Sequence, residues 1–320
     1  MSAPAIGARA PGRLAATLSA GGFAVTAELT PPKGTNTDAL RRRARELAGY
    51  VDAVNLTDNA SAIVRLASWA AAVAVMEEGV EAVCQLQCRD RNRLALQSDL
   101  LGAATLGIPN VLLLTGDAAG AGDHPGAKAV FDLDSIELIW AAVTLRDEGR
   151  FLSGAPLSSR PRLFLGAVEN PFAPPLEFRA ERLARKVAAG AEFVQTQFVF
   201  DLRGFATFLR RAEDLGVTER CPVLAGVGPI RSRRSLEHLR HGVPGVVVPD
   251  SYAAGFDGVA DGQFAEVGIS RCAEMVAQLR EMPGLGGVHL MAFSPESVPE
   301  ILERSGLAAE RRRQQERSAG

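Results

Sequence analysis

Short apolar runs recur along the chain, and each is followed by a polar or glycine-rich turn and then by an amphipathic stretch. The runs are nearly continuous in Val, Leu, Ala and Phe, which indicates parallel strands buried on both faces. We interpret the following runs as strands: Phe23–Leu29, Val51–Thr57, Glu81–Gln87, Asn110–Thr115, Arg162–Val168, Glu192–Thr196, Pro222–Val227 and Gly287–Phe293.

Helical periodicity fills the intervals between these runs. The predicted helices are Asp38–Leu47, Asn92–Leu106, Asp134–Leu145, Glu177–Ala189, Leu202–Leu215 and Arg234–His241. Asp134 predicts an N-terminal cap for the third of them. Strand starts lie about 30 residues apart, with longer excursions after the fourth and the seventh strand, and eight strand–helix units in about 300 residues favour a closed (β/α)8 TIM barrel over an open doubly wound sheet.

The pattern divides the chain into three parts. Residues 1–22 are interpreted as a lead-in segment, residues 23–307 as a single barrel domain, and residues 308–320 as a charged tail. The stretch Arg311–Gly320 is so rich in charged and amide side chains that we expect it not to pack against the barrel. No low-complexity linker interrupts the barrel region, and we expect no second domain within it.

The charge balance argues against some classes of partner. Lys and Arg number 35 against 37 Asp and Glu, a formal net charge of −2, so there is no general attraction to nucleic acid or to an anionic membrane. No apolar run reaches the roughly 20 residues that span a bilayer. The first 22 residues lack the apolar core of a signal peptide, so we expect a cytoplasmic enzyme.

The four cysteines and four histidines do not form a recognisable site. The cysteines are too few and too scattered for a disulfide framework, so we expect buried thiols. No histidines share a metal-ligand spacing, and no Ser–His–Asp triad is visible, so we expect no metal. Only His289 lies in a predicted strand, and a core or surface role is expected for each histidine.

The catalytic residues of a (β/α)8 barrel come from the carboxyl ends of its strands. The first predicted strand ends with Glu28. A carboxylate at the mouth of an apolar barrel is costly to ionise unless it is paired, so Glu28 should hold a proton more readily than an exposed glutamate, as a general acid requires. A structural glutamate that accepts hydrogen bonds is the alternative reading.

The other strand ends are rich in groups that orient polar ligands. Gln85–Asn92 follows the third strand, and its Arg-Asp-Arg run could fix a loop or contact an anion. Gly116 permits close approach of the backbone to a ligand. The glycine-rich loop Ala118–Asp132 could cradle a phosphate, although it matches no dinucleotide or Walker fingerprint. Gln197 beside Phe198 suits a flat heteroaromatic ligand.

At these strand ends the sequence resembles the methylenetetrahydrofolate reductase family, flavin-containing barrels that make 5-methyltetrahydrofolate. The likeness runs from about Phe23 to about Leu307, and it is strongest to the branch in which the reductase is found fused to a homocysteine methyltransferase domain. The motifs that carry it are AELTPPKG (27–34), QCRDRNRLALQSDLLGA (87–103), LLLTGD (112–117), GDHPGAKAVFDLDS (122–135), RKVAAGAEFVQTQFVFD (185–201) and GVGPI (226–230).

The resemblance implies a chemical role for three side chains. Glu28 matches the acid that protonates N10 of the folate, Asp117 matches an aspartate beside flavin and pterin, and Gln197, with Phe198 next to it, matches the glutamine that binds the pterin. The implied reaction is ping-pong: NADH or NADPH reduces bound FAD, which then reduces 5,10-methylenetetrahydrofolate. The positions implied to contact the cofactor are Thr57, Gln85, Leu114, Thr115, Gly116, Asp117, Phe131, Asp132 and Lys186.

Several positions depart from the family pattern. Gln85 stands where a histidine is common, Val168 and Phe172 stand where a tyrosine and a histidine are expected, and Arg179 replaces an acidic residue. These substitutions alter the expected grip on FAD, while the acid, the aspartate and the glutamine of the chemical step remain.

Three alternative functions stay open. They are a reductase that transfers hydride directly from NADH without flavin, a pterin-binding methyltransferase that serves a corrinoid partner, and a non-catalytic folate-binding subunit. The expected partners are a reduced folate and a nicotinamide nucleotide. A homo-oligomer or a complex with another protein of the one-carbon pathway is compatible with the sequence.

Overall fold

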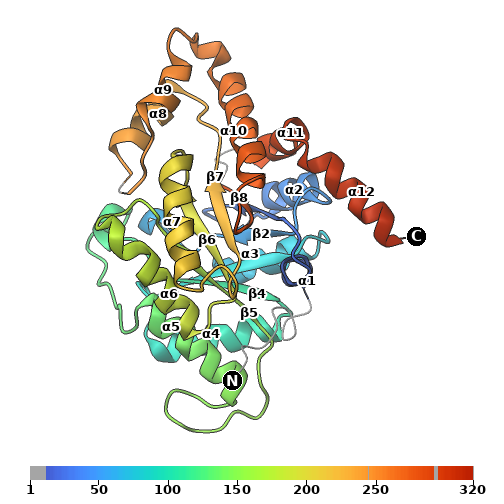
Figure 1. Ribbon diagram of the computed structural model, residues 1–320. Helices are drawn as coiled ribbons and strands as arrows, with labels where there is room; N and C mark the ends of the chain where they lie inside the picture. The colour runs from blue at the N-terminus through green and yellow to red at the C-terminus, as the bar shows by residue number, and fades with distance from the viewer. Residues whose placement is uncertain (1–11, 244, 292–294, 320) are drawn as a thin grey trace.

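Eight parallel strands close into a barrel in the order in which they occur in the chain, β1 to β8, as predicted. A computed structural model describes residues 12–319 except residues 244 and 292–294 (Figure 1). The strands are β1 Ala24–Leu29, β2 Ala53–Leu56, β3 Ala82–Gln87, β4 Asn110–Leu114, β5 Phe164–Glu169, β6 Phe193–Phe198, β7 Val223–Val227 and β8 Leu285–Leu290. The last two residues predicted for β8, at positions 292 and 293, lie outside the described residues.

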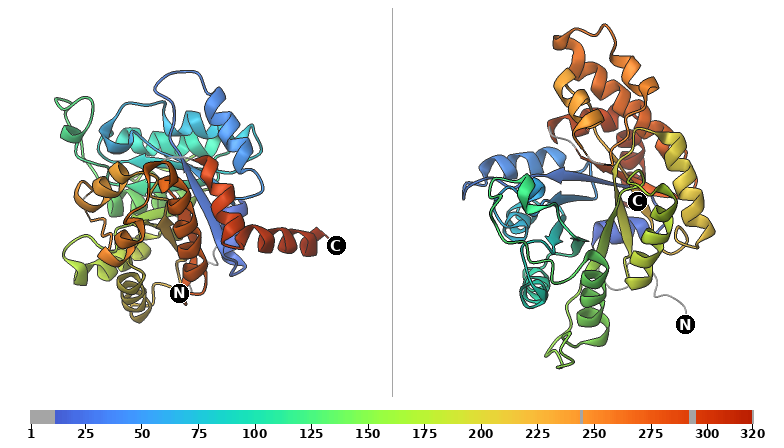
Figure 2. Two further views of the ribbon diagram at one scale, coloured as in Figure 1. Left: turned by 90° about the horizontal axis from the view of Figure 1, so that it is seen from above. Right: turned by 90° about the vertical axis from the view of Figure 1, so that its left-hand side faces the viewer.

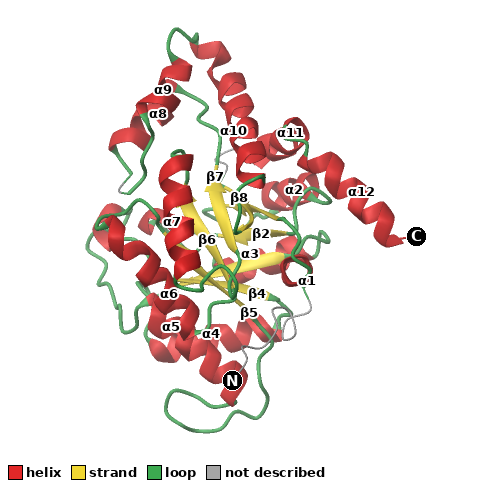
Figure 3. Cartoon of the chain, in the orientation of Figure 1, coloured by secondary structure: helices red, strands yellow, loops and turns green. Residues whose placement is uncertain are grey.

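Helices surround the barrel and cover the outer faces of the strands (Figure 3). They are α1 Arg13–Ser19, α2 Asp38–Leu47, α3 Ser68–Met76, α4 Arg93–Thr105, α5 Ser135–Val143, α6 Arg179–Ala189, α7 Leu202–Asp214, α8 Arg233–His241, α9 Asp250–Ala253, α10 Phe264–Arg280, α11 Val298–Arg304 and α12 Leu307–Ala319. All six predicted helices are present, and Asp134 caps α5 in a reciprocal pair with Glu137. The sequence pattern missed α3 because SWAAAVAVM is almost wholly apolar and shows no polar face.

The floor of the barrel is an apolar layer closed from below by α1. The inward side chains of this layer include Val83, Leu112, Phe164, Phe193 and Leu224, and they pack with Leu14, Ala15 and Leu18 of α1. The carboxylate of Glu81 accepts hydrogen bonds from the first amides of α1, which places a negative charge at the positive end of that helix. The predicted lead-in segment therefore contains a helix that seals the barrel; residues 1–11 of that segment lie outside the described residues.

Two longer excursions interrupt the strand–helix alternation, as predicted. The one between β7 and β8 contains α8, α9 and α10 and rises above the barrel in the orientation of Figure 1. The one between β4 and β5 contains the glycine-rich loop, α5 and a hairpin-like loop closed by a bridge between Arg150 and Pro156. The four cysteines are buried and free, and burial raises the pKa of the thiols of Cys84, Cys88 and Cys272 to about 12.

The prediction that the carboxyl-terminal stretch does not pack is wrong for its beginning. This stretch belongs to α12, whose end projects from the body of the molecule (Figure 2). Leu307 and Ala308 are buried. The guanidinium of Arg311 makes two hydrogen bonds of 2.8 Å to the carboxylate of Asp52, and that carboxylate also accepts from the backbone amide of Val25. The sequence could not show this anchor because Asp52 lies at the opposite end of the chain.

We expect Arg311→Ala to lower the free energy of unfolding by about 2 to 4 kcal/mol, because it leaves a buried carboxylate with neutral donors only. The side chain of Asp52 is 3% exposed and that of Arg311 is 11% exposed. Urea denaturation monitored by circular dichroism measures the effect. Arg312→Ala is the matched control, since its pair with Glu303 is largely solvated and should contribute less than about 1 kcal/mol. Equal losses for the two variants would contradict the proposed anchor.

Candidate active site

Side chains at alternate positions of each strand point into the barrel, and this alternation gathers the predicted site residues. Counting by twos upward from the apolar floor brings Glu28 on β1, Thr57 after β2, Leu114 on β4 and Gln197 on β6 to the carboxyl end of the lumen. Glu28 and Gln197 line one cavity of about 640 Å3. The structure therefore brings the predicted acid and the predicted ring-binding amide together.

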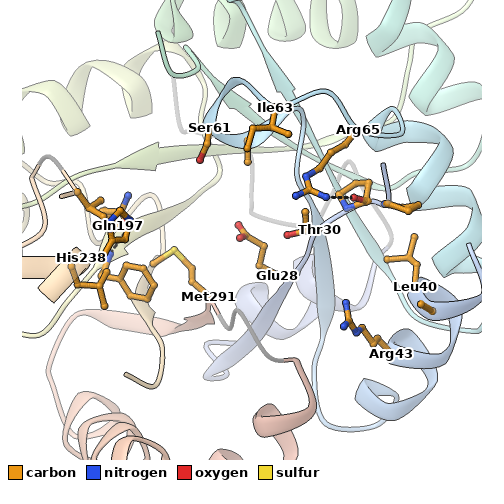
Figure 4. Close-up of a pocket in the computed structure, with 17 residues that line it drawn as sticks. Glu28, Thr30, Leu40, Arg43, Ser61, Ile63, Arg65, Gln197, His238 and Met291 are labelled. Atoms are coloured by element: carbon orange, nitrogen blue, oxygen red, sulfur yellow. Dashed lines mark hydrogen bonds between the residues drawn. The ribbon is translucent and has the colours of Figure 1, made fainter. Parts of the chain in front are cut away.

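The cavity walls come from segments that are far apart in the sequence (Figure 4). Thr30–Pro32 follows β1, and α2 and α8 contribute one helix face each. Phe198 lies beside Gln197, and Met291 follows β8. The remaining part of the wall is the loop after β2, which contributes Ala60, Ser61, Ile63 and Arg65.

Glu28 sits in the open part of the barrel mouth with a histidine beneath it. The side chain of Glu28 is 30% exposed, and its Oε2 lies 3.9 Å from Nε2 of His289, whose side chain is 4% exposed. On the other side of the ring, His289 Nδ1 is 2.9 Å from Oγ1 of Thr26. The sequence indicated only a core or surface role for His289; Thr26 and His289 pair across β1 and β8, a contact that the sequence does not reveal.

A chain of buried hydrogen bonds leads from Asn55 to His289. Asn55 and Gln195 exchange reciprocal amide hydrogen bonds of 2.6 and 3.1 Å, and the second N–H of Gln195 donates to Oγ1 of Thr26 at 3.0 Å. Thr26 Oγ1 is in turn 2.9 Å from Nδ1 of His289. The chain therefore fixes the position of the ring, and Nε2 is the nitrogen that faces Glu28.

The loop after β2 is held in an unusual backbone conformation over the cavity. Asn59, Ser61 and Ala62 all have left-handed backbone angles, with φ of 45°, 55° and 56°. The carboxylate of Asp117 accepts the backbone N–H of Ser61 at 2.9 Å. Asp117 is not among the residues that line the cavity, so it supports the cavity wall through Ser61.

The charged run after β3 fixes loops instead of facing the cavity. Arg89 is 2% exposed, and it donates to the backbone oxygens of Asn59 and Asp117 and to the carboxylate of Asp90. Its guanidinium holds the pKa of Asp90 below the ordinary range. Of the two roles that the sequence left open for this run, loop fixation is the one observed.

The end of β4 requires glycine for a steric reason. Gly116 has φ of +95°, and a Cβ atom at this position would lie 2.2 Å from Oε1 of Gln87. Leu114 and Thr115 are partly buried at the same strand end. Their carbonyl oxygens accept the backbone N–H groups of Cys88 and Arg89 at 3.1 Å, and contact of this strand end with a ligand stays a prediction.

The side chains predicted to contact a cofactor differ in their burial and in whether they already have a hydrogen-bond partner. Thr57 is 2% exposed, and its Oγ1 has no hydrogen-bond partner in the described part of the chain. Gln85 is 8% exposed on the inward face of β3. Phe131, with φ of 42°, lies on the loop surface, and the carboxylate of Asp132 is bonded to Arg93.

Lys186 is placed differently from the expectation. Its side chain is 4% exposed, and Nζ donates to Oε2 of Glu169 at 2.8 Å and to the backbone oxygen of Val168. Burial lowers the pKa of Lys186, while the Glu169 carboxylate opposes that shift. Arg179 and Arg182 lie 3.7 and 3.9 Å from the same carboxylate. The ammonium group predicted to contact the cofactor is therefore buried and already bonded within the protein.

The structure is a (β/α)8 barrel in which the carboxylate of Glu28 and the side-chain amide of Gln197 line one cavity at the carboxyl end of the strands. The chain belongs to the methylenetetrahydrofolate reductase family, because residues 13–306 match the family model described as "Methylenetetrahydrofolate reductase". No helix in the described part of the chain is long and apolar enough to cross a membrane.

Curated relatives with the family name are distant and much longer. The chain is 27% identical to the "Probable methylenetetrahydrofolate reductase (NADPH)" of Caenorhabditis elegans, over 72% of this chain and 33% of the relative. It is 25% identical to "Methylenetetrahydrofolate reductase 2" of Schizosaccharomyces pombe, over 74% and 37%, and 27% identical to "Methylenetetrahydrofolate reductase (NADH) 1" of Zea mays, over 72% and 39%. The aligned part thus spans about a third of each relative.

Solved structures support the fold alone. An uncharacterized Clostridium thermocellum protein, described as binding two copies of 5-methyl-5,6,7,8-tetrahydrofolic acid, superposes with a TM-score of 0.58 at 13% identity, covering 89% of this chain and 95% of that one. DmoA from Hyphomicrobium sulfonivorans superposes with a TM-score of 0.58 at 10% identity, covering 92% and 88%.

The Arg93–Asp132 pair gives a pH prediction for the loop over β3 and β4. Hydrogen bonds from Arg93 lower the pKa of Asp132 from 3.8 to about 2. A depressed carboxyl pKa stabilises the folded state at pH values above 3.8, and this stabilisation is lost as the pH falls toward 2. We expect a carboxyl titration followed by NMR to give a midpoint near 2 in the wild type and a higher midpoint, still below 3.8, in Arg93→Gln, because the backbone N–H at position 93 continues to donate to the carboxylate. The same midpoint in both proteins would show that Arg93 does not hold this carboxylate.

Proposed function

We propose that this chain reduces 5,10-methylenetetrahydrofolate to 5-methyltetrahydrofolate with hydride that originates from NADH or NADPH. The observation that carries the proposal is the position of Glu28 in one cavity with Gln197. A site for binding alone does not need a carboxylic acid at the centre of its cavity, whereas protonation of a leaving nitrogen does. Membership of the reductase family supports the same reaction.

Gln197 is oriented to bind one edge of a flat heterocycle. Its Oε1 accepts the backbone N–H of Phe198 at 2.9 Å, so its amide hydrogens are the groups available to a ligand. We assign them to the pterin ring, with Phe198 beside it. Asp117 contributes indirectly by holding Ser61 and the loop that covers the ring.

Glu28 then acts as the general acid. It donates its proton to N10 of the bound folate, the bond between N10 and the methylene carbon breaks, and a 5-iminium cation forms. Addition of hydride to the methylene carbon completes the methyl group, and NAD(P)H becomes NAD(P)+. The partial exposure of Glu28 allows solvent to return its proton, and His289 lies beneath the carboxylate with Nε2 at 3.9 Å from Oε2.

A flavin would fit over the ends of β2 and β4. The buried hydroxyl of Thr57 has no partner in the described part of the chain, and Leu114, Thr115 and Gly116 are partly exposed at the end of β4; these groups suit the polar edge of an isoalloxazine ring. When bound, FAD would supply the hydride relay between nicotinamide and folate. Lys186 is not part of this fit, because Glu169 occupies its ammonium group.

The Lys186–Glu169 pair also favours a second candidate, direct hydride transfer from NAD(P)H to the folate. A buried lysine that already neutralises a carboxylate does not offer its charge to a cofactor phosphate. In this second candidate Glu28 and Gln197 keep the roles described above, and only the hydride donor next to the folate differs.

We expect Glu28→Gln to lower the rate of folate reduction by about 10^2- to 10^4-fold, because the amide cannot protonate N10. Stopped-flow measurement of 5-methyltetrahydrofolate formation gives this rate. The affinity for NADH, measured separately by titration, should stay within about twofold of wild type, since the variant keeps the shape of the side chain. Undiminished folate reduction would remove Glu28 from the proposed role.

We expect the purified protein to show flavin absorbance near 450 nm if the first candidate holds, because an isoalloxazine ring absorbs there. Thr57→Val should then weaken flavin binding by about fivefold, the loss of one hydrogen bond. Lys186→Met should leave flavin content unchanged and lower the free energy of unfolding by about 1 to 2 kcal/mol, because Glu169 loses its buried hydrogen-bonded partner but keeps Arg179 and Arg182 within 4 Å. A colourless protein that still reduces the folate would establish the second candidate instead.

A further inference from the structure

Helix α2 carries four arginines, Arg41, Arg42, Arg43 and Arg45. Two of them pair with the glutamates that directly follow α3. Arg41 pairs with Glu77 at 2.5 Å and with Glu78 at 3.1 Å. Arg45 pairs with Glu78 at 2.6 Å. These contacts hold α2 against the end of α3. Arg41 and Arg45 therefore have a structural role.

Arg43 belongs to a different face of the same helix. Ala39, Leu40 and Arg43 line the cavity that contains Glu28, and their spacing of three and four residues places them on one side of α2. Arg43 is exposed, and its guanidinium makes no hydrogen bond or ion pair with the residues that the structure describes. It is a positive charge directed at the ligand cavity and not at another helix (Figure 4).

Arg65 adds a second guanidinium to the same part of the cavity. One of its nitrogens donates to the backbone oxygen of Pro31 at 3.1 Å, which fixes the group at the wall between the loops after β1 and β2. Glu28 is the one carboxylate among the residues that line this cavity. The lining therefore has two guanidiniums against one carboxylate, an arrangement that favours a ligand with negative charge.

The positions of these groups give the cavity a direction. In Figure 4, Gln197 and His238 lie on one side of Glu28, and Arg43 and Arg65 lie on the other. A ligand that reaches from Gln197 past Glu28 thus ends at the two arginines. Arginine binds carboxylates through paired N–H donors more specifically than a single point charge does.

We propose that Arg43, assisted by Arg65, binds the glutamate carboxylates of the folate substrate. This inference rests on the proposed function, in which the pterin ring lies at Gln197 and N10 lies at Glu28. The benzoyl-glutamate part is attached at N10, so it must leave the ring on the side of Glu28 away from Gln197. That is the side on which Arg43 and Arg65 lie. The phosphates of NAD(P)H are the other anions that could reach these residues.

Isothermal titration calorimetry with two forms of the reaction product tests the proposal. The first probe is 5-methyltetrahydrofolate, and the second is 5-methyltetrahydropteroate, which has the same ring and benzoyl group but no glutamate. We expect wild type to bind the first probe about tenfold more tightly than the second, a typical contribution of a charge-assisted hydrogen bond. In Arg43→Gln this preference should fall to about threefold or less.

Arg42→Gln is the matched control. Arg42 is exposed on the same helix but does not line the cavity, so this variant should keep the tenfold preference while losing the same formal charge. Equal weakening of both probes in Arg43→Gln would overturn the proposal, because the effect would not depend on the glutamate. Weakened binding of NADH with an unchanged folate preference would also overturn it, and would assign Arg43 to the nucleotide phosphates.

The same titration separates failure of this inference from failure of the proposed function. If wild type binds neither probe, the folate assignment itself is wrong, and the inference falls with it. If wild type binds both probes with the same affinity, the folate site stands and the carboxylate subsite is refuted.

Discussion

The closed barrel imposes one constraint on which the rest of the molecule depends: every second residue of every strand must enter the lumen. The floor satisfies it with Phe164, Phe193 and their apolar neighbours, sealed by α1. One step higher the lumen contains a polar group, in which Thr26, Asn55, Gln195 and His289 contact one another. At the third step the lumen opens, and Glu28 and Gln197 meet the ligand cavity.

The polar middle layer links stability to the proposed chemistry. Asn55, Gln195, Thr26 and His289 are nearly inaccessible to water, so their amides, hydroxyl and ring must satisfy one another. These bonds fix the position of the His289 ring, whose Nε2 faces Glu28 at 3.9 Å. The polar layer thereby connects the buried part of the lumen with the proposed acid.

Charged residues around the mouth divide into those that hold the frame and those left for a ligand. Arg89 and Arg91 bind carboxylates and backbone oxygens of the neighbouring loops, and Lys186 forms an ion pair with Glu169. The guanidinium of Arg43 forms no hydrogen bond or ion pair with any residue that the structure describes. The sequence alone does not distinguish a cation that is paired within the protein from one that is not. Lys186 has a carboxylate partner in Glu169, whereas Arg43 has no partner in the described part of the chain.

The sequence by itself determined the eight strands, six of the twelve α-helices in the described part of the chain, and the positions of Glu28 and Gln197 at the carboxyl ends of their strands, because buried parallel strands and amphipathic helices leave periodic local patterns. It also determined the family through motifs that are contiguous in the chain. Only the tertiary structure decided that α12 is anchored on Asp52, that Asp117 accepts a hydrogen bond from Ser61, that Lys186 is paired with Glu169, and that His289 lies beneath Glu28. Each of these contacts joins residues from separate elements, and hydrogen bonds and ion pairs of that kind depend on distances in space that no local pattern of side chains records.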